Sequence, residues 1–137
     1  MQGMPKILIT GSSGKVVSKI AETVSQHAQC IGVDLVPGRF TTHLGSITDR
    51  RFMDGMISGV DAVIHSAAYL TPHVGVVGDA EFRRVNVHGT EVLLDLAIRH
   101  HVARFVFTST TSVYGCTTRP KSEALWVNEG ISDFACS

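Results

Sequence analysis

The 137-residue sequence predicts an α/β protein with a doubly wound parallel sheet of about five strands. Short apolar runs alternate with segments whose apolar residues recur at helical spacing, which is the pattern of βαβ units. The first run, residues 6–10, is apolar without alternation, as expected for a strand that helices cover on both faces. The length and the ordinary globular composition suit one domain.

The first half of the chain begins with this strand at residues 6–10, which Gly11 ends. Apolar residues at helical spacing then predict a first helix that continues to about His27. A second strand is expected at residues 30–34, and a weak third strand at residues 40–44.

The second half repeats the alternation. Asp49 is expected to cap a short helix, and residues 61–65 form a fourth predicted strand. A long helix is expected over residues 79–100, because its apolar residues lie on one stripe. Residues 104–108 are the fifth predicted strand, joined to the others by right-handed crossovers. After Gly115 the pattern becomes irregular, without another strand–helix unit.

Composition argues against several classes of partner. The formal net charge is +0 at pH 7, so bulk charge attracts neither nucleic acid nor an anionic membrane. No run approaches the roughly 20 apolar residues that a membrane span needs. No histidine or cysteine spacing is typical of a metal site. The three cysteines are odd in number and far apart, and we interpret them as reduced thiols of a cytoplasmic protein.

The strongest chemical signal is the segment Thr-Gly-Ser-Ser-Gly-Lys-Val-Val at residues 10–17. Glycines between a strand and a helix let the backbone approach a pyrophosphate, and the helix N-terminus offers unpaired N–H groups. The strand–loop–helix context is what this motif requires. The alternative is a plain turn rich in small residues.

Asp34 ends the second strand, 23 residues after Gly11 (34 − 11). A carboxylate there can accept hydrogen bonds from the hydroxyls of the adenosine ribose and repels a 2′-phosphate, which favours NAD over NADP. The alternative is an aspartate that starts the turn at residues 36–38. Arg39 is a possible partner for a 2′-phosphate, but it lies five residues beyond Asp34 (39 − 34), and we discount it.

Four motifs, in order, resemble those of the extended short-chain dehydrogenase/reductase family, in its branch of sugar-nucleotide epimerases and dehydratases. The resemblance covers roughly residues 5–129 and implies an NAD-binding Rossmann fold. The motifs are Ile-Thr-Gly-Ser-Ser-Gly at residues 9–14, Val-Ile-His-Ser-Ala-Ala at residues 63–68, Asn-Val-His-Gly-Thr at residues 86–90 and Thr-Ser-Thr-Thr-Ser-Val-Tyr-Gly at residues 108–115.

The resemblance implies a role toward NAD for each matching residue. Asp34 would hold the adenosine ribose, with Ser46 and Ile47 beside the adenine. Asn86 would support the pocket from the long helix, and Thr108 would sit against the nicotinamide. The pyrophosphate would be contacted, largely through backbone, by Gly11, Ser13, Gly14, Lys15 and Val16. The nicotinamide-side ribose and the phosphate path would be lined by Ala67, Ala68 and Leu70.

Thr110 lies four residues before Tyr114, where the family has its catalytic serine or threonine. The resemblance implies that its hydroxyl hydrogen-bonds the substrate oxygen and steers proton transfer. The alternative is a hydroxyl that caps loop backbone at the end of a strand.

The sequence departs from the family at three places. Val17 replaces the third glycine of the loop, and we expect it to push the first helix off the sheet and weaken cofactor binding. Ser46 stands where many relatives carry an acidic residue beside the adenine. The family's Tyr-x-x-x-Lys pair is absent from the sequence, because His73 and Thr118 stand four residues beyond its two tyrosines.

Two hypotheses for function follow. In the first, residues 1–137 are an incomplete Rossmann domain, an N-terminal fragment without the substrate-binding C-terminal domain, of an NAD-dependent oxidoreductase that acts on a sugar or sugar-nucleotide hydroxyl. In the second, the chain is a non-catalytic NAD-binding module that senses cofactor or pairs with another subunit. We also expect a homodimer or self-association, because we expect the apolar residues Phe105, Val106 and Phe107 to point inward from an edge strand that nothing covers.

Overall fold

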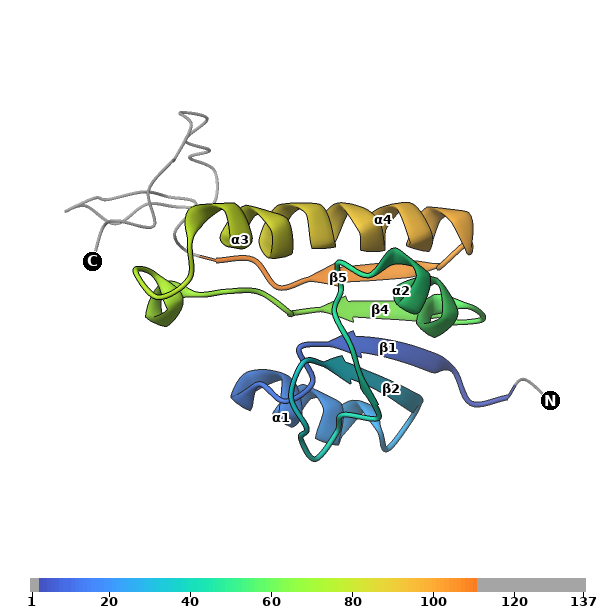
Figure 1. Ribbon diagram of the computed structural model, residues 1–137. Helices are drawn as coiled ribbons and strands as arrows, with labels where there is room; N and C mark the ends of the chain where they lie inside the picture. The colour runs from blue at the N-terminus through green and yellow to red at the C-terminus, as the bar shows by residue number, and fades with distance from the viewer. Residues whose placement is uncertain (1–2, 111–137) are drawn as a thin grey trace, which may run out of the picture.

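A computed structural model describes residues 3–110 of the chain (Figure 1). Its centre is a sheet of five strands in the order β3-β2-β1-β4-β5, and every paired neighbour is parallel. This arrangement confirms the predicted fold class. The strands are β1 (Lys6–Thr10), β2 (Gln29–Asp34), β3 (His43–Leu44), β4 (Ala62–His65) and β5 (Arg104–Phe107).

Helices connect the strands and cover the sheet. Figure 1 shows α3 and α4 as one long helical rod that runs alongside β5, while α1 lies beside β2 at the other side of the view. The helices are α1 (Lys15–Val24), α2 (Arg50–Ile57), the 3-10 turn η1 (Thr71–His73), α3 (Asp79–Arg83), the π-helical segment η2 (Arg84–Gly89) and α4 (Thr90–Arg99). None of the helices within residues 3–110 is long and apolar enough to cross a membrane.

Two apolar clusters fill the space on opposite faces of the sheet. In β1, Leu8 belongs to the larger cluster, which includes residues of α2 and α4. The next residue, Ile9, belongs to a smaller cluster with Val17 and Ala21 of α1. Successive side chains of a strand point to opposite faces, so an unbroken apolar run gives β1 two buried faces.

Val17 is a core residue, 4% exposed, in contact with the cluster of Ile9 and Ala21. The expectation that this valine would push α1 off the sheet is therefore wrong. The space that a third glycine would leave between helix and strand is occupied here by the valine side chain.

Two predicted elements, α1 and β3, are clearly shorter in the structure than expected. Helix α1 ends at Val24 rather than about His27, and the cap residue Ser25 donates its N–H to Ala21 O. Strand β3 has only two of the five residues predicted over 40–44. The preceding residues form a turn instead, in which Thr41 N donates to Gly38 O at 3.0 Å.

The long helix expected over residues 79–100 contains a π-helical segment at residues 84–89. Gly89 packs so closely on the loop after β3 that a Cβ there would meet Ile47 Cδ1 at 2.6 Å. The Thr90 hydroxyl donates to Asn86 O at 2.7 Å. Single π turns within α-helices are rare and frequent at functional sites, and apolar periodicity does not reveal them.

Strand β5 is an edge strand of the described sheet, and its side chains alternate. Phe105 packs against the larger cluster, whereas Val106 is 54% and Phe107 is 56% exposed. The expectation that all three point inward is wrong for Val106, because adjacent residues of a strand face opposite sides. Phe107 shares the side of Phe105, where both rings contact His65, but it is still more than half exposed.

Candidate cofactor site

The candidate site lies at the carboxyl ends of β1, β2 and β4. From β1, the chain places β2 and β3 on one side and β4 and β5 on the other, so the strand order reverses between β1 and β4. In open α/β sheets, ligands bind in the crevice outside the strand ends at such a switch point. The glycine loop and residues 66–70 follow the ends of β1 and β4, and Asp34 is the last residue of β2.

The glycine loop needs its first glycine for two reasons. Gly11 has a φ of 73°, a left-handed conformation that side chains disfavour. A Cβ at this position would also meet Ala67 N at 2.8 Å, because the loop crosses directly over the chain that leaves β4. Hydrogen bonds from Gly11 N to Val33 O at 2.9 Å and from Gly14 N to Gly11 O at 3.0 Å fix this conformation.

The N-terminus of α1 opens onto the loop. Gly14 is its N-cap, and no side chain caps the helix. The first-turn N–H groups have no partner within the helix, and no acidic residue of that turn repels an anion. Lys15 and Val16, expected beside the pyrophosphate, are the first two residues of this turn and are exposed.

The Asp34 carboxylate is bound to the glycine loop. Its Oδ2 accepts from Ser13 N at 2.9 Å and from Ser13 Oγ at 2.7 Å. Its Oδ1 accepts from the N–H groups of Leu35 and Val36, at 2.7 and 3.2 Å. The structure thus brings together the predicted ribose acid and the predicted pyrophosphate loop, and it also contains the turn of the alternative interpretation.

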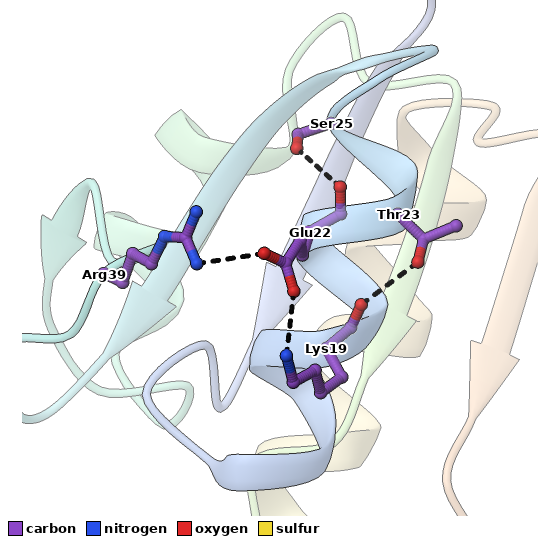
Figure 2. Close-up of polar contacts among 5 residues, drawn as sticks. All are labelled: Lys19, Glu22, Thr23, Ser25 and Arg39. Carbon is purple, nitrogen blue, oxygen red and sulfur yellow. Dashed lines mark hydrogen bonds and ion pairs between the residues drawn. The ribbon is translucent and has the colours of Figure 1, made fainter.

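Arg39 is engaged with helix α1 (Figure 2). Its Nη1 donates to Glu22 Oε1 at 3.0 Å, and Lys19 Nζ donates to Glu22 Oε2 at 3.1 Å. The hydrogen bond from Lys19, together with that from Arg39, lowers the pKa of the Glu22 carboxyl. These exposed ion pairs stabilise the fold little. They do give the Arg39 guanidinium a carboxylate partner on α1, Glu22, in place of the 2′-phosphate of NADP.

His65, at the end of β4, is 1% exposed and forms a buried hydrogen-bond chain. Its Nδ1 lies 2.7 Å from Thr10 Oγ1, and its Nε2 lies 2.9 Å from Thr90 Oγ1. Because the Thr90 hydroxyl already donates to Asn86 O, Nε2 must carry the proton and donate to Thr90. The Thr10 hydroxyl then donates to Nδ1 and accepts from Ser66 N and Ala67 N.

This series of hydrogen bonds connects Thr10, the residue before Gly11, to Asn86 in the π-helical segment. Burial lowers the pKa of His65 to about 4, so the imidazole is neutral near pH 7. The rings of Phe105, edge-on to the imidazole, and of Phe107, tilted against it, lie 6.1 and 5.6 Å away between ring centroids. Sequence reasoning did not place Thr10, His65 and Thr90 in one network, although each lies in one of the four motifs.

The Asn86 side chain hydrogen-bonds the backbone of the loop after β4. Its Nδ2 donates to Tyr69 O at 2.9 Å, and its Oδ1 accepts from Tyr69 N at 2.8 Å. These two bonds hold the segment that carries the predicted cofactor-lining residues, of which Ala67 is half-buried and Ala68 and Leu70 are exposed.

The remaining predicted residues have separate surroundings. Ser46 Oγ lies 2.8 Å from Thr48 Oγ1, while the Ile47 side chain is buried in the core, so only the Ile47 backbone can face an adenine. Thr108 N donates to His65 O at 3.0 Å, and Thr108 and Thr110 are exposed. Tyr114 and the segment after Gly115 lie outside the described residues. No cluster of three metal-ligating side chains occurs within residues 3–110.

Comparison with known proteins identifies a family and several relatives. The chain matches the NAD dependent epimerase/dehydratase family over residues 7–134. A dTDP-glucose 4,6-dehydratase of Actinoplanes sp. is 42% identical over 77 residues, which are 56% of this chain and 24% of that protein. A 3 beta-hydroxysteroid dehydrogenase/Delta 5-->4-isomerase of Mycobacterium tuberculosis is 32% identical over 119 residues, 79% of this chain and 32% of that protein. The chain thus spans less than a third of either relative.

Solved structures agree with this match. A short-chain dehydrogenase/reductase superfamily protein from Agrobacterium tumefaciens with bound NAD has a TM-score of 0.69 at 35% identity, covering 80% of this chain and 34% of its own. UDP-glucose 4-epimerase from Thermotoga maritima, with UDP-glucose, has a TM-score of 0.74 at 26% identity, covering 84% and 41%. The family match over residues 7–134, with the loop, acid and switch point described above, shows that this chain belongs to the NAD dependent epimerase/dehydratase family.

Proposed function

We propose that this chain binds NAD at the carboxyl ends of β1, β2 and β4, as the cofactor-binding part of an oxidoreductase that acts on a sugar or sugar-nucleotide hydroxyl. One observation carries the proposal: the Asp34 carboxylate lies against the glycine loop, at hydrogen-bond distance from Ser13. A ribose acid and a pyrophosphate loop must be adjacent to hold one dinucleotide.

The residues fit NAD by shape and charge. Gly11 has no Cβ, which would otherwise collide with Ala67, so the loop can pack against the backbone that leaves β4. The uncapped first turn of α1 offers N–H groups to a pyrophosphate. Asp34 would accept the ribose hydroxyls and repel the additional phosphate of NADP. Ser46 and the Ile47 backbone would flank the adenine, and Ala67, Ala68, Leu70 and Thr108 would line the path to the nicotinamide.

The chemistry needs a hydride acceptor, which NAD supplies when bound. Thr110 would hydrogen-bond the substrate oxygen and orient it for proton transfer. The proton needs a base, and His65 cannot serve, because both ring nitrogens are bonded inside the protein and burial lowers its pKa to about 4. The family's own base belongs to the Tyr-x-x-x-Lys pair, which this sequence does not contain.

The substrate class is proposed from the relatives. Proteins that match this chain include dTDP-glucose 4,6-dehydratases and a UDP-glucose 4-epimerase with UDP-glucose. We therefore propose a sugar-nucleotide substrate for a protein that contains this NAD-binding part. A cytoplasmic location stays a prediction from the cysteines.

The second candidate function is an NAD-binding module without turnover that senses cofactor or pairs with another subunit. Such a module would bind NAD at the same site. Sugar-nucleotide oxidation, followed as NADH absorbance, separates the two candidates. Measured on a protein that contains this NAD-binding part, turnover that is lost in Thr110→Ala supports the enzyme, whereas NAD binding without turnover supports the module.

The NAD site itself is tested by calorimetry with NAD and NADP. We expect the native chain to bind NAD more tightly than NADP, and Asp34→Ala to narrow that difference. Asp95→Ala is the matched control, because Asp95 is an exposed aspartate of α4 that pairs with Arg50 of α2. Equal affinity of the native chain for both cofactors would remove Asp34 from the proposed role.

A further inference from the structure

The Asp34 carboxylate accepts four hydrogen bonds within the protein. Two reach Oδ1 from the backbone N–H groups of Leu35 and Val36. Two reach Oδ2 from Ser13, one from its backbone N–H and one from its hydroxyl. A carboxylate offers about four lone-pair sites, so these bonds use its acceptor capacity.

Only one of the four donors can leave without moving the backbone. The N–H groups of Leu35 and Val36 directly follow β2, and the N–H of Ser13 belongs to a loop held by Gly11 and Gly14. The Ser13 hydroxyl, in contrast, can turn away by rotation about the Cα–Cβ bond. A ribose hydroxyl that donates to Asp34 therefore competes with this hydroxyl.

We propose that the Ser13 hydroxyl is a competing donor which the adenosine ribose displaces from Asp34, so that Ser13 sets both the affinity and the NAD preference of the site. The inference rests on the proposed NAD site. The three backbone donors keep the carboxylate in place while one acceptor position on Oδ2 passes from Ser13 to the ribose. Binding replaces one charge-assisted hydrogen bond by another, so the net gain is smaller than at an open carboxylate.

The same competition acts differently on NADP. A 2′-phosphate has no hydroxyl proton to donate at that position and is repelled by the carboxylate. The Ser13 hydroxyl donates to this carboxylate and offsets part of its charge. Removing the hydroxyl therefore favours NAD alone and widens the difference between the two cofactors.

Calorimetry of the full chain carrying Ser13→Ala tests the proposal. The Kd for NAD is expected to fall about 3- to 10-fold, and the Kd for NADP to stay or rise. Loss of a structural hydrogen bond would only weaken binding, so a tighter Kd is specific to competition. Ser25→Ala is the control, because that hydroxyl donates to Glu22 O at the far end of α1 and should change neither Kd (Figure 2).

An NAD analogue whose adenosine ribose lacks both hydroxyls tests the contact directly. It should bind the native chain and Ser13→Ala equally, since it has nothing to place on Asp34. Unchanged or weaker NAD binding by Ser13→Ala, with an unchanged Tm, overturns the competition. If Asp34→Ala still weakens NAD binding in that case, the proposed NAD site stands and only the role of Ser13 fails. If Asp34→Ala has no effect, the site and the inference fail together.

Discussion

Gly11 lies against Ala67 so closely that a Cβ at position 11 would meet the Ala67 nitrogen at 2.8 Å. The first residue of the glycine loop thus rests on the backbone that leaves β4, and Thr10 reaches the same backbone through its hydroxyl. The loop after β1 and the loop after β4 therefore form one unit, and a change at their contact alters both walls of the proposed NAD site.

Gly11→Ala should cost more stability than its backbone strain alone. The φ of 73° imposes a penalty of about 1–3 kcal/mol on a side chain, and the contact with Ala67 adds to it. Gly59→Ala is a close control, because Gly59 has a φ of 71° and no atom within 4 Å of its would-be Cβ. Chemical denaturation should show a larger loss for Gly11→Ala, with loss of NAD binding in that variant only. Equal losses of stability in the two variants would mean that the backbone at Ala67 moves aside at no cost.

Val17→Gly should destabilise the chain rather than tighten NAD binding. The variant removes a buried side chain and adds helix flexibility, for a loss of about 2–4 kcal/mol in the free energy of unfolding. Val16→Gly, next in the same turn but exposed, measures the flexibility alone, at about 1 kcal/mol. Chemical denaturation of both variants gives the comparison. Tighter NAD binding by Val17→Gly would restore the idea that the valine crowds the helix.

The sequence predicted the fold well, since β1, β4 and β5 are local apolar runs and the Asp49 cap of α2 is a local signal: Asp49 accepts from Phe52 N at 3.0 Å. It also placed Asp34 and the glycine loop in one site. The π turn could not be predicted, because apolar periodicity does not reveal it, and Gly89 within it packs on Ile47, which is far away in sequence. The fit of Val17 likewise depends on how α1 lies on β1, which periodicity does not specify.

The stability of the chain should fall between neutral and acid pH because of His65. Burial lowers its pKa to about 4 in the folded chain, against 6.5 for an ordinary histidine. Between these values the unfolded chain binds more protons, so the contribution is complete above pH 6.5 and is lost as the pH falls toward 4. The loss is about 3 kcal/mol, from a 2.5-unit difference in pKa (6.5 − 4).

His65→Gln isolates this effect, since an amide can both donate and accept but does not titrate in this range. Its free energy of unfolding, measured by denaturation from pH 7 to pH 4.5, should decline less steeply than that of the native chain. The lowered pKa values of Glu22, Asp54 and Glu81 act at lower pH and are common to both chains. Parallel curves for the two chains would show that His65 is not the source.

Self-association should depend on β5, the longer of the two edge strands of the described sheet. Val106 and Phe107 are both more than half exposed there, and an apolar edge with unpaired backbone groups is a template for another chain. We expect analytical ultracentrifugation at tens of micromolar to show dimers or larger species, and Val106→Lys to shift the chain toward monomer. Leu44→Lys is the control: Leu44 is 59% exposed on β3, the opposite edge, whose two residues offer few hydrogen bonds to a partner. A native chain that sediments as one monomeric species, or an equal response to both variants, would show that β5 does not direct association.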